Sequence, residues 1–350
     1  MFADRMKNLT PYTPGEQPQD GGFIKLNTNE NPYPPTPLIK DFLTNIETSR
    51  LRLYPDPTSK KLREVIAEAD KLEPDNVFIG NGSDEVLSFV FFGFFDGNYG
   101  PLLFPEFTYS FYPVYSGFYN IPYKKIPLLH DYSLDIDSYL EGKSTGIILP
   151  NPNAPTGIAL PLERIKYMLD NYSSGRLVAI DEAYIAFGGE SAASLINDYD
   201  NLLVVRTFSK SSSLAGLRLG YALGNKKLIS ALNTVKDSFN SYPVDFIAGK
   251  CGELSISDKA YSNDIISKII TTRENFKREA EAIGWELLPS KANFVFTRKN
   301  GLSGEEIYLR LKEKKILVRH FNKDGIRDFV RITIGTDEQM TQLIAAMKEL

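Results

Sequence analysis

The chain has 350 residues, of which 42% are hydrophobic and 24% charged, and its formal net charge is −4. This composition is typical of a globular protein of about two domains, and the mildly acidic charge gives no reason to expect nucleic acid or an anionic membrane as a partner. The single cysteine excludes an internal disulfide, and the two histidines, without HExxH or CxxC spacing, predict no metal site.

The first forty residues are rich in Pro, Gly and Asn, which predicts an extended arm over 1–40 with little regular structure. Such an arm lies on another subunit or on a second domain, or it is a disordered leader. Its beginning lacks an apolar signal segment. The most apolar stretch, 86–95, is far short of the roughly 20 residues that span a bilayer. We therefore expect a cytoplasmic protein and interpret 86–95 as a buried helix.

Strand and helix patterns alternate from residue 41 to 237. Residues 58–72 have a helical period, and continuous apolar runs bounded by turn residues lie at 76–80, 100–104, 146–149, 177–180 and 202–205. Continuous apolar runs suit strands that are covered on both faces. They predict an α/β fold with a mostly parallel, doubly wound sheet, whose ligands bind beyond the carboxyl ends of the strands. Longer helical patterns at 265–283 and 303–314, with short strands at 292–297 and 329–334, predict a smaller α+β domain over 238–350.

Polar residues follow these strands. Lys210 comes after the strand at 202–205 within Arg-Thr-Phe-Ser-Lys, and a small-residue stretch then leads to Arg218. A lysine at a buried strand end can form a Schiff base with an aldehyde, and nearby hydroxyls with an arginine would hold a phosphate. Pyridoxal 5′-phosphate (PLP) is the simplest ligand that needs both groups.

Asp181 and Tyr184 follow the strand at 177–180. A buried carboxylate needs a partner, and the protonated pyridine nitrogen of PLP would be one, although an aspartate at this place, taken alone, is more often a helix N-cap. The turn Gly-Asn-Gly-Ser-Asp-Glu at 80–85 offers an anion site at a helix start and matches neither a dinucleotide nor an NTP loop. Arg331 and Arg319 lie in strands of the predicted small domain and suit an anionic substrate.

Together these motifs resemble those of a known family. The segments that carry the resemblance are 26–33, 54–57, 80–85, Asn-Pro-Asn-Ala-Pro-Thr-Gly at 151–157, 181–184, 206–210, 214–221 and 331–336. Over essentially its whole length the chain resembles the fold-type I PLP-dependent aminotransferases, and within them the enzymes that act on histidinol phosphate.

The resemblance implies a role for each matching residue. Lys210 would hold the cofactor and move the proton, Asp181 would pair with the ring nitrogen, Tyr184 would contact the phenolic oxygen, and Tyr109 would stack on the ring. The phosphate would be held by Gly82, Ser83, Thr207, Ser209, Arg218 and, from the other subunit of a homodimer, Tyr54. The substrate would be bound by Tyr12, Asn29, Arg319 and Arg331.

Two segments depart from the family pattern. After Lys210, three serines at 211–213 replace a more usual small-aromatic-Gly stretch, which leaves the chemistry intact. The other departure concerns the phenolic oxygen. The residue before Pro-Thr-Gly is commonly an asparagine that donates to the phenolic oxygen, and here it is Ala154. We predict that Asn153 substitutes for it, the alternative being that Tyr184 acts alone.

The resemblance implies transamination between histidinol phosphate and 2-oxoglutarate in histidine biosynthesis. An aromatic amino acid aminotransferase, a threonine-phosphate decarboxylase and a non-catalytic PLP-binding protein share the motifs and remain as alternatives. No DNA-binding extension supports the last of these, and it would not need Lys210, Asp181, Tyr184 and Arg331 together.

Overall fold

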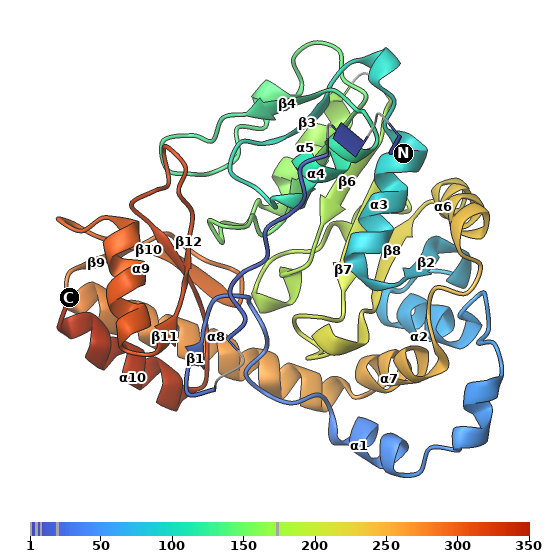
Figure 1. Cartoon of the computed structure of the whole chain (residues 1–350). Helices are drawn as coiled ribbons and strands as arrows, with labels where there is room; N and C mark the ends of the chain where they lie inside the picture. Colours follow the sequence, from blue (N-terminus) through green and yellow to red (C-terminus); the bar gives the residue numbers. More distant parts are fainter. Residues whose placement is uncertain (1, 4–5, 8, 19–20, 173–174) are drawn as a thin grey trace.

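The computed structural model describes residues 2–3, 6–7, 9–18, 21–172 and 175–350. A large domain contains the central sheet, and a smaller domain lies beside it (Figure 1). The two are connected by helix α8 (Lys259–Ala282), which continues the direction of α7 (Phe246–Ser257) beneath the large domain. The predicted two-domain α/β organisation is therefore present.

In the described part of the chain the large sheet has seven strands, in the order β2-β8-β7-β6-β5-β3-β4. The strands are β2 (Val77–Gly80), β3 (Leu102–Pro105), β4 (Tyr123–Ile126), β5 (Gly146–Pro150), β6 (Val178–Asp181), β7 (Leu202–Thr207) and β8 (Gly220–Gly224). Strands β3 to β7 pair in parallel, whereas β8 runs antiparallel to both of its neighbours. The prediction of a mostly parallel sheet is confirmed, and the strands that the apolar runs did not predict are β4 and β8.

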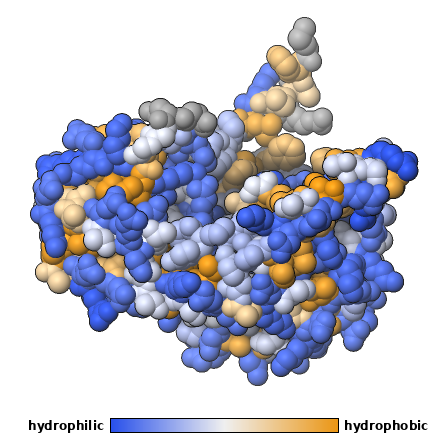
Figure 2. Space-filling model, turned by 90° about the horizontal axis from the view of Figure 1, so that it is seen from below, coloured by the Kyte–Doolittle hydropathy of each residue, from blue (hydrophilic) through white to orange (hydrophobic). Residues whose placement is uncertain are grey.

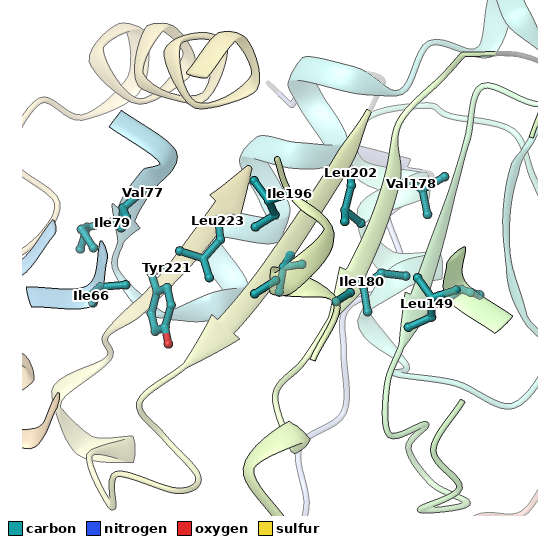
Figure 3. Packing of buried hydrophobic residues seen from close by; sticks show 14 of the residues in the cluster. Ile66, Val77, Ile79, Leu149, Val178, Ile180, Ile196, Leu202, Tyr221 and Leu223 are labelled. Carbon is teal, nitrogen blue, oxygen red and sulfur yellow. The ribbon is translucent and has the colours of Figure 1, made fainter. Parts of the chain in front are cut away.

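Helices cover both faces of this sheet, which explains why its inner strands are mostly apolar, whereas the edge strand β4 (Tyr-Lys-Lys-Ile) is largely exposed. One face packs on α3 (Gly82–Phe94), α4 (Phe111–Phe118) and α6 (Lys226–Phe239). The other face packs on α2 (Lys60–Asp70), α5 (Leu162–Asn171) and α7. Alternate residues of one strand serve the two cores: Val178 and Ile180 point to the second face, where Figure 3 shows them beside Leu202, and Ala179 points to the first.

The small domain is built on an antiparallel sheet in the order β12-β13-β10-β9. Its elements are β9 (Trp285–Leu287), β10 (Phe294–Lys299), α9 (Gly304–Glu313), β11 (Ile316–Leu317), β12 (Arg319–His320), β13 (Val330–Thr333) and α10 (Asp337–Lys348). Helices α9 and α10 both begin with a capping box, Ser303 with Glu306 and Thr336 with Gln339. Each box satisfies two backbone N–H groups at the helix start and so fixes where the helix begins.

Part of the predicted arm over 1–40 is not a separate extended segment but is packed into the small domain. Strand β1 (Ile24–Lys25) pairs in parallel with β11, and Leu26 is part of the small-domain core. Helix α1 (Pro37–Thr44) already begins within the predicted arm. At the other boundary, Ala248 and Cys251 of α7 pack in the core of the large domain. We therefore propose to place the domain boundary between α7 and α8 rather than at residue 237.

The surface seen from below in Figure 2 is mostly hydrophilic, with apolar residues gathered in separate patches. Helix α3 includes most of the predicted buried apolar stretch, and its residues Val86, Leu87, Val90 and Phe91 are buried. No helix among the described residues is both long enough and apolar enough to cross a membrane.

Candidate functional site

Two adjoining cavities open at the carboxyl ends of the central strands. The first, of about 180 Å³, is lined by the last residues of β5, β6 and β7, which are Pro150, Asp181 and Thr207. The second, of about 170 Å³, extends toward β12 and β13 of the small domain. Residues common to both are Thr28, Tyr109, Ala154, Tyr184 and Lys210. The sheet topology thus gathers polar groups that are distant in the sequence, as the strand-end argument predicts.

Lys210 lies where the two cavities meet. It follows β7 after Phe208 and Ser209, and its Nζ donates to the carbonyl oxygen of Thr28 over 3.2 Å. The same nitrogen is 5.7 Å from the ring centroid of Tyr184. The amine is therefore accessible from both cavities, which is the position required of a group that bonds a cofactor in one and removes a proton from a substrate in the other.

Asp181 is a buried carboxyl group, with 5% of its surface exposed. Burial, which penalises the charged form, raises the pKa of this carboxyl group to about 6. Its oxygens accept hydrogen bonds from the hydroxyl of Tyr112 at 3.0 Å and the backbone N–H of Ala183 at 3.2 Å. Among the described residues no cation pairs with it, so a buried negative charge faces the first cavity without a counter-charge.

The opposite end of the first cavity is suited to an anion. Gly82 has φ +82°, a conformation that glycine adopts without strain, and with Ser83 it forms the first turn of α3. Backbone N–H groups at a helix start bind phosphate groups. A Cβ atom at Gly82 would lie 2.9 Å from the guanidinium of Arg218, which itself donates to Asp84 over 2.7 Å. Arg218 is thus close to the turn and neutralised by Asp84.

Hydroxyl groups complete this end of the cavity. Thr207 and Ser209 both line it, and the Oγ1 of Thr207 accepts a hydrogen bond from the backbone N–H of Ser209 over 3.1 Å. Tyr109 lines both cavities, and its hydroxyl donates to Asp84 over 2.8 Å. The structure therefore brings together, around one cavity, the residues that the sequence predicts for the ring and the phosphate: Ser83, Tyr109, Asp181, Tyr184, Thr207, Ser209, Lys210 and Arg218.

Asn153 is not among them, and the expectation that it replaces an asparagine at position 154 is corrected. Its amide nitrogen donates away from the cavities, to the carbonyl of Phe107 at 3.0 Å and to Thr156 Oγ1 at 3.2 Å. It lines a separate cavity, whereas the adjacent Ala154 lines both parts of the site. The hydroxyl of Tyr184 instead accepts a hydrogen bond from the side chain of Asn29 over 2.9 Å.

The second cavity contains the predicted substrate-binding residues Tyr12, Asn29, Arg319 and Arg331. The guanidinium of Arg331 lies 5.3 Å from the ring centroid of Phe294 and donates to the backbone of Asn27 over 3.1 Å. Its Nε is buried and has no hydrogen-bond partner among the described residues. Burial lowers the pKa of Arg331 from its usual value. A partly buried cation with an unpartnered Nε donor is suited to bind the anionic group of a ligand.

Tyr54 lies apart from both cavities. Its side chain is 84% exposed and stacks on Tyr242 with ring centroids 4.7 Å apart. It lines another cavity, of about 390 Å³, between the turn at 54–59 and α7. Within one chain, therefore, Tyr54 does not reach the candidate site.

Sequence patterns missed two features beside the site. One is the contact of Tyr112 with Asp181. The other is a partly buried ion-pair network, in which Arg206 of β7 contacts Glu182 at 2.9 Å and Asp70 of α2 at 2.8 Å. In the sequence Arg206 is adjacent to Thr207 and Glu182 is adjacent to Asp181. This adjacency to predicted site residues was the only sequence feature that could have indicated the network.

The residues of the first cavity fit PLP. The uncompensated carboxylate of Asp181 matches a protonated ring nitrogen, the glycine turn with Arg218 matches a phosphate, and Lys210 lines the same cavity. Such a buried carboxylate is costly unless it acquires a partner.

Comparisons with known proteins agree with this chemistry. The family model for aminotransferases of class I and II matches residues 22–347. The chain is 57% identical over 353 residues to a histidinol-phosphate aminotransferase of Syntrophus aciditrophicus (strain SB), covering 100% of this chain and 98% of the relative. It is 49% identical over 348 residues to that of Lactococcus lactis subsp. cremoris (strain MG1363), covering 99% and 97%. The crystal structure of histidinol-phosphate aminotransferase from Sinorhizobium meliloti in complex with pyridoxal-5′-phosphate has a TM-score of 0.89 and 23% identity, and the match covers 99% of this chain and 96% of that one.

Proposed function

The chain belongs to the class I and II aminotransferases and is a PLP-dependent enzyme, and we propose that it transfers the amino group of histidinol phosphate to 2-oxoglutarate. The products would be imidazole acetol phosphate and glutamate, in histidine biosynthesis. The observation that carries the proposal is the meeting of two cavities at Lys210, one with Asp181 and a turn suited to phosphate, the other with the partly buried cation of Arg331. The relatives of 57% and 49% identity bear the name of this activity.

PLP, when bound, supplies an aldehyde that takes up the amino group and a ring that withdraws electrons from the substrate. Asp181 would keep the ring nitrogen protonated because a buried carboxylate favours a cation beside it. Lys210 Nζ, once neutral, would take the proton from the α-carbon of the substrate. Tyr184, oriented by Asn29, would donate to the phenolic oxygen. Tyr109 would stack on the ring.

The phosphate of the cofactor would be bound by the turn of Gly82 and Ser83, by the hydroxyls of Thr207 and Ser209, and by Arg218. Arg218 is paired with Asp84 at 2.7 Å, so a phosphate would share this cation with the carboxylate. In the second cavity Arg331, assisted by Arg319, would bind the phosphate of histidinol phosphate or a carboxylate of glutamate. Tyr12 and Asn29 would border the substrate.

We further propose that two copies of the chain form a homodimer in the cytoplasm, with Tyr54 of each copy reaching the cofactor phosphate of the other. Support comes from the exposure of Tyr54 together with Leu51 and Leu53, which leaves apolar side chains uncovered in one short segment. Exposed apolar patches of this kind mark interaction surfaces.

A substrate comparison on the purified holoenzyme tests the proposal. Histidinol phosphate should convert the cofactor to its amino form, with kcat/KM roughly 100-fold above that for phenylalanine, because a phosphate carries more charge and offers more acceptor oxygens to Arg331 and Arg319 than the carboxylate of phenylalanine does. The absorbance of the cofactor follows the reaction. A preference for phenylalanine would identify an aromatic aminotransferase, and release of carbon dioxide from threonine phosphate would identify a decarboxylase. Borohydride trapping at the native site after Lys210→Ala would refute the role of Lys210.

A further inference from the structure

Tyr112 has a buried hydroxyl group that contacts Asp181. The side chain lies on α4 and is 0% exposed. Its ring is walled by Phe91, Phe104 and Tyr109, with centroid distances of 6.1, 5.8 and 5.7 Å. A tyrosine hydroxyl in such an apolar environment requires a hydrogen-bond partner. It donates to Asp181 Oδ2 over 3.0 Å.

This contact holds one of the two oxygens of the Asp181 carboxyl group. The other oxygen accepts from the backbone N–H of Ala183 over 3.2 Å. With a donor at each oxygen, the carboxyl group cannot rotate without breaking a hydrogen bond. The donor on Ala183 belongs to the backbone, so Tyr112 provides the side-chain contact that a substitution can remove.

We propose that Tyr112 is a positioning residue, which holds the carboxylate of Asp181 in place and in its charged form at the cofactor pocket. The inference rests on the assignment of Asp181 to the cofactor ring nitrogen made above. Tyr112 does not line either cavity, so it acts through Asp181 and not on the cofactor itself.

The charges around Asp181 give this hydrogen bond its importance. Burial, Asp84 and Glu182 raise the pKa of Asp181, and the hydroxyl of Tyr112 lowers it, with the balance at about 6. Burial and the nearby Asp181 raise the pKa of Tyr112 far above its usual value, so the phenol stays protonated and donates. The other titratable groups in this region are Tyr109 just before α4, Tyr115 within α4, and Lys210 and Arg218 in the lining of the cavity. Without the phenol, the pKa of Asp181 would rise toward neutrality, and a protonated carboxyl group cannot neutralise the ring cation.

The test uses Tyr112→Phe, which removes one oxygen atom and keeps the ring. In the cofactor-free protein, carbon NMR of labelled aspartate should show the pKa of Asp181 shifted upward, with Asp181→Asn identifying the resonance. Because a hydrogen bond to a charged group is removed, PLP should bind roughly ten- to a hundredfold more weakly at neutral pH. Part of that loss should be recovered at alkaline pH, where the carboxyl group ionises. A purely structural defect would weaken binding equally at every pH.

Tyr139→Phe is the matched control. Tyr139 is 1% exposed, and its hydroxyl has no hydrogen-bond partner among the described residues. Its removal should change neither the titration of Asp181 nor cofactor affinity. An unchanged Asp181 titration in Tyr112→Phe, or a loss of affinity that does not vary with pH, would overturn the inference. If Asp181→Asn itself bound PLP normally, the assignment of Asp181 in the proposed function would fail instead.

Discussion

Gly220 offers a direct test of how the sheet supports the phosphate-binding turn. It opens β8 and pairs with Gly80 of β2 on one side and Thr207 of β7 on the other, so the sheet holds its backbone from both sides. A Cβ atom at this position would lie 2.3 Å from the backbone nitrogen of Ser83 and 2.5 Å from the carbonyl carbon of Gly82. Both are backbone atoms, so no side-chain rotation can relieve the contact.

The cost of Gly220→Ala follows from these distances. Ordinary van der Waals contact begins at 3.4 Å, so the turn must move away by 3.4 less 2.3, or 1.1 Å. Overpacking of this kind costs about 1–3 kcal/mol, and a backbone contact on a strand fixed on both sides places Gly220→Ala near the upper value. A shift of about 1 Å also moves the N–H groups of the turn away from the phosphate, and we expect cofactor affinity to fall roughly tenfold or more.

Denaturant unfolding of the cofactor-free variant measures the first effect, and titration with PLP measures the second. Gly117→Ala is the control, because a Cβ atom there meets nothing within 4 Å. Gly117 lies within α4, so alanine should stabilise the protein by about 0.5–1 kcal/mol. If Gly220→Ala unfolds at the denaturant concentration of the parent and binds PLP equally well, close packing of β8 does not position the turn.

Three further predictions concern charge and assembly. Burial raises the pKa of Asp181 from its unfolded value of 3.8 to about 6. The cofactor-free protein should therefore lose up to about 3 kcal/mol of stability relative to Asp181→Asn as the pH rises from about 4 through about 6. Denaturant unfolding at a series of pH values measures this loss, and a difference that does not vary with pH would contradict the raised pKa. Glu182→Ala removes a buried carboxylate but leaves the partly buried Arg206 with Asp70 as a partner, so denaturant unfolding should show a loss of about 2 kcal/mol, the range for a hydrogen bond to a charged group. A loss below about 1 kcal/mol would mean that the pair behaves as an exposed one. Mixing inactive Lys210→Ala and Tyr54→Ala chains should restore about a quarter of parental activity. Half of the dimers are then hybrids, and each hybrid has one intact site of two, with Lys210 from one chain and Tyr54 from the other. No recovery of activity would exclude a shared site.

The residues at strand ends were predictable because a local pattern locates them. Asp181 and Lys210 each follow a continuous apolar run, and parallel strands necessarily bring their carboxyl ends to one edge. Strand β8 was not predicted, because Gly-Tyr-Ala-Leu-Gly is short and has glycine at both ends. The antiparallel pairing of β8 depends on contacts with β2 and β7 that only the folded chain supplies.

Side-chain direction was the part that sequence could not give. Asn153 and Ala154 are neighbours in one loop, and the course of the backbone turns Ala154 to the site and Asn153 away. The segment 104–112 contains many aromatic residues. Their spacing does not show that Tyr109 lines the cavity, whereas Tyr112 lies outside it and donates a hydrogen bond to Asp181. Partners of this kind are separated by many residues and are visible only in three dimensions.

We propose that Asn29 compensates for the alanine at position 154. It has φ +55°, in a region where asparagine is among the favoured residues, and its backbone N–H donates to Thr333 of the small domain over 2.9 Å. Its side chain donates to Tyr184 of the large domain over 2.9 Å. An asparagine at position 154 would act on the phenolic oxygen from within the large domain alone. With Ala154 there, the orientation of the Tyr184 hydroxyl depends on a residue held by the small domain, so the arrangement of the two domains bears directly on the proton donor at the cofactor ring.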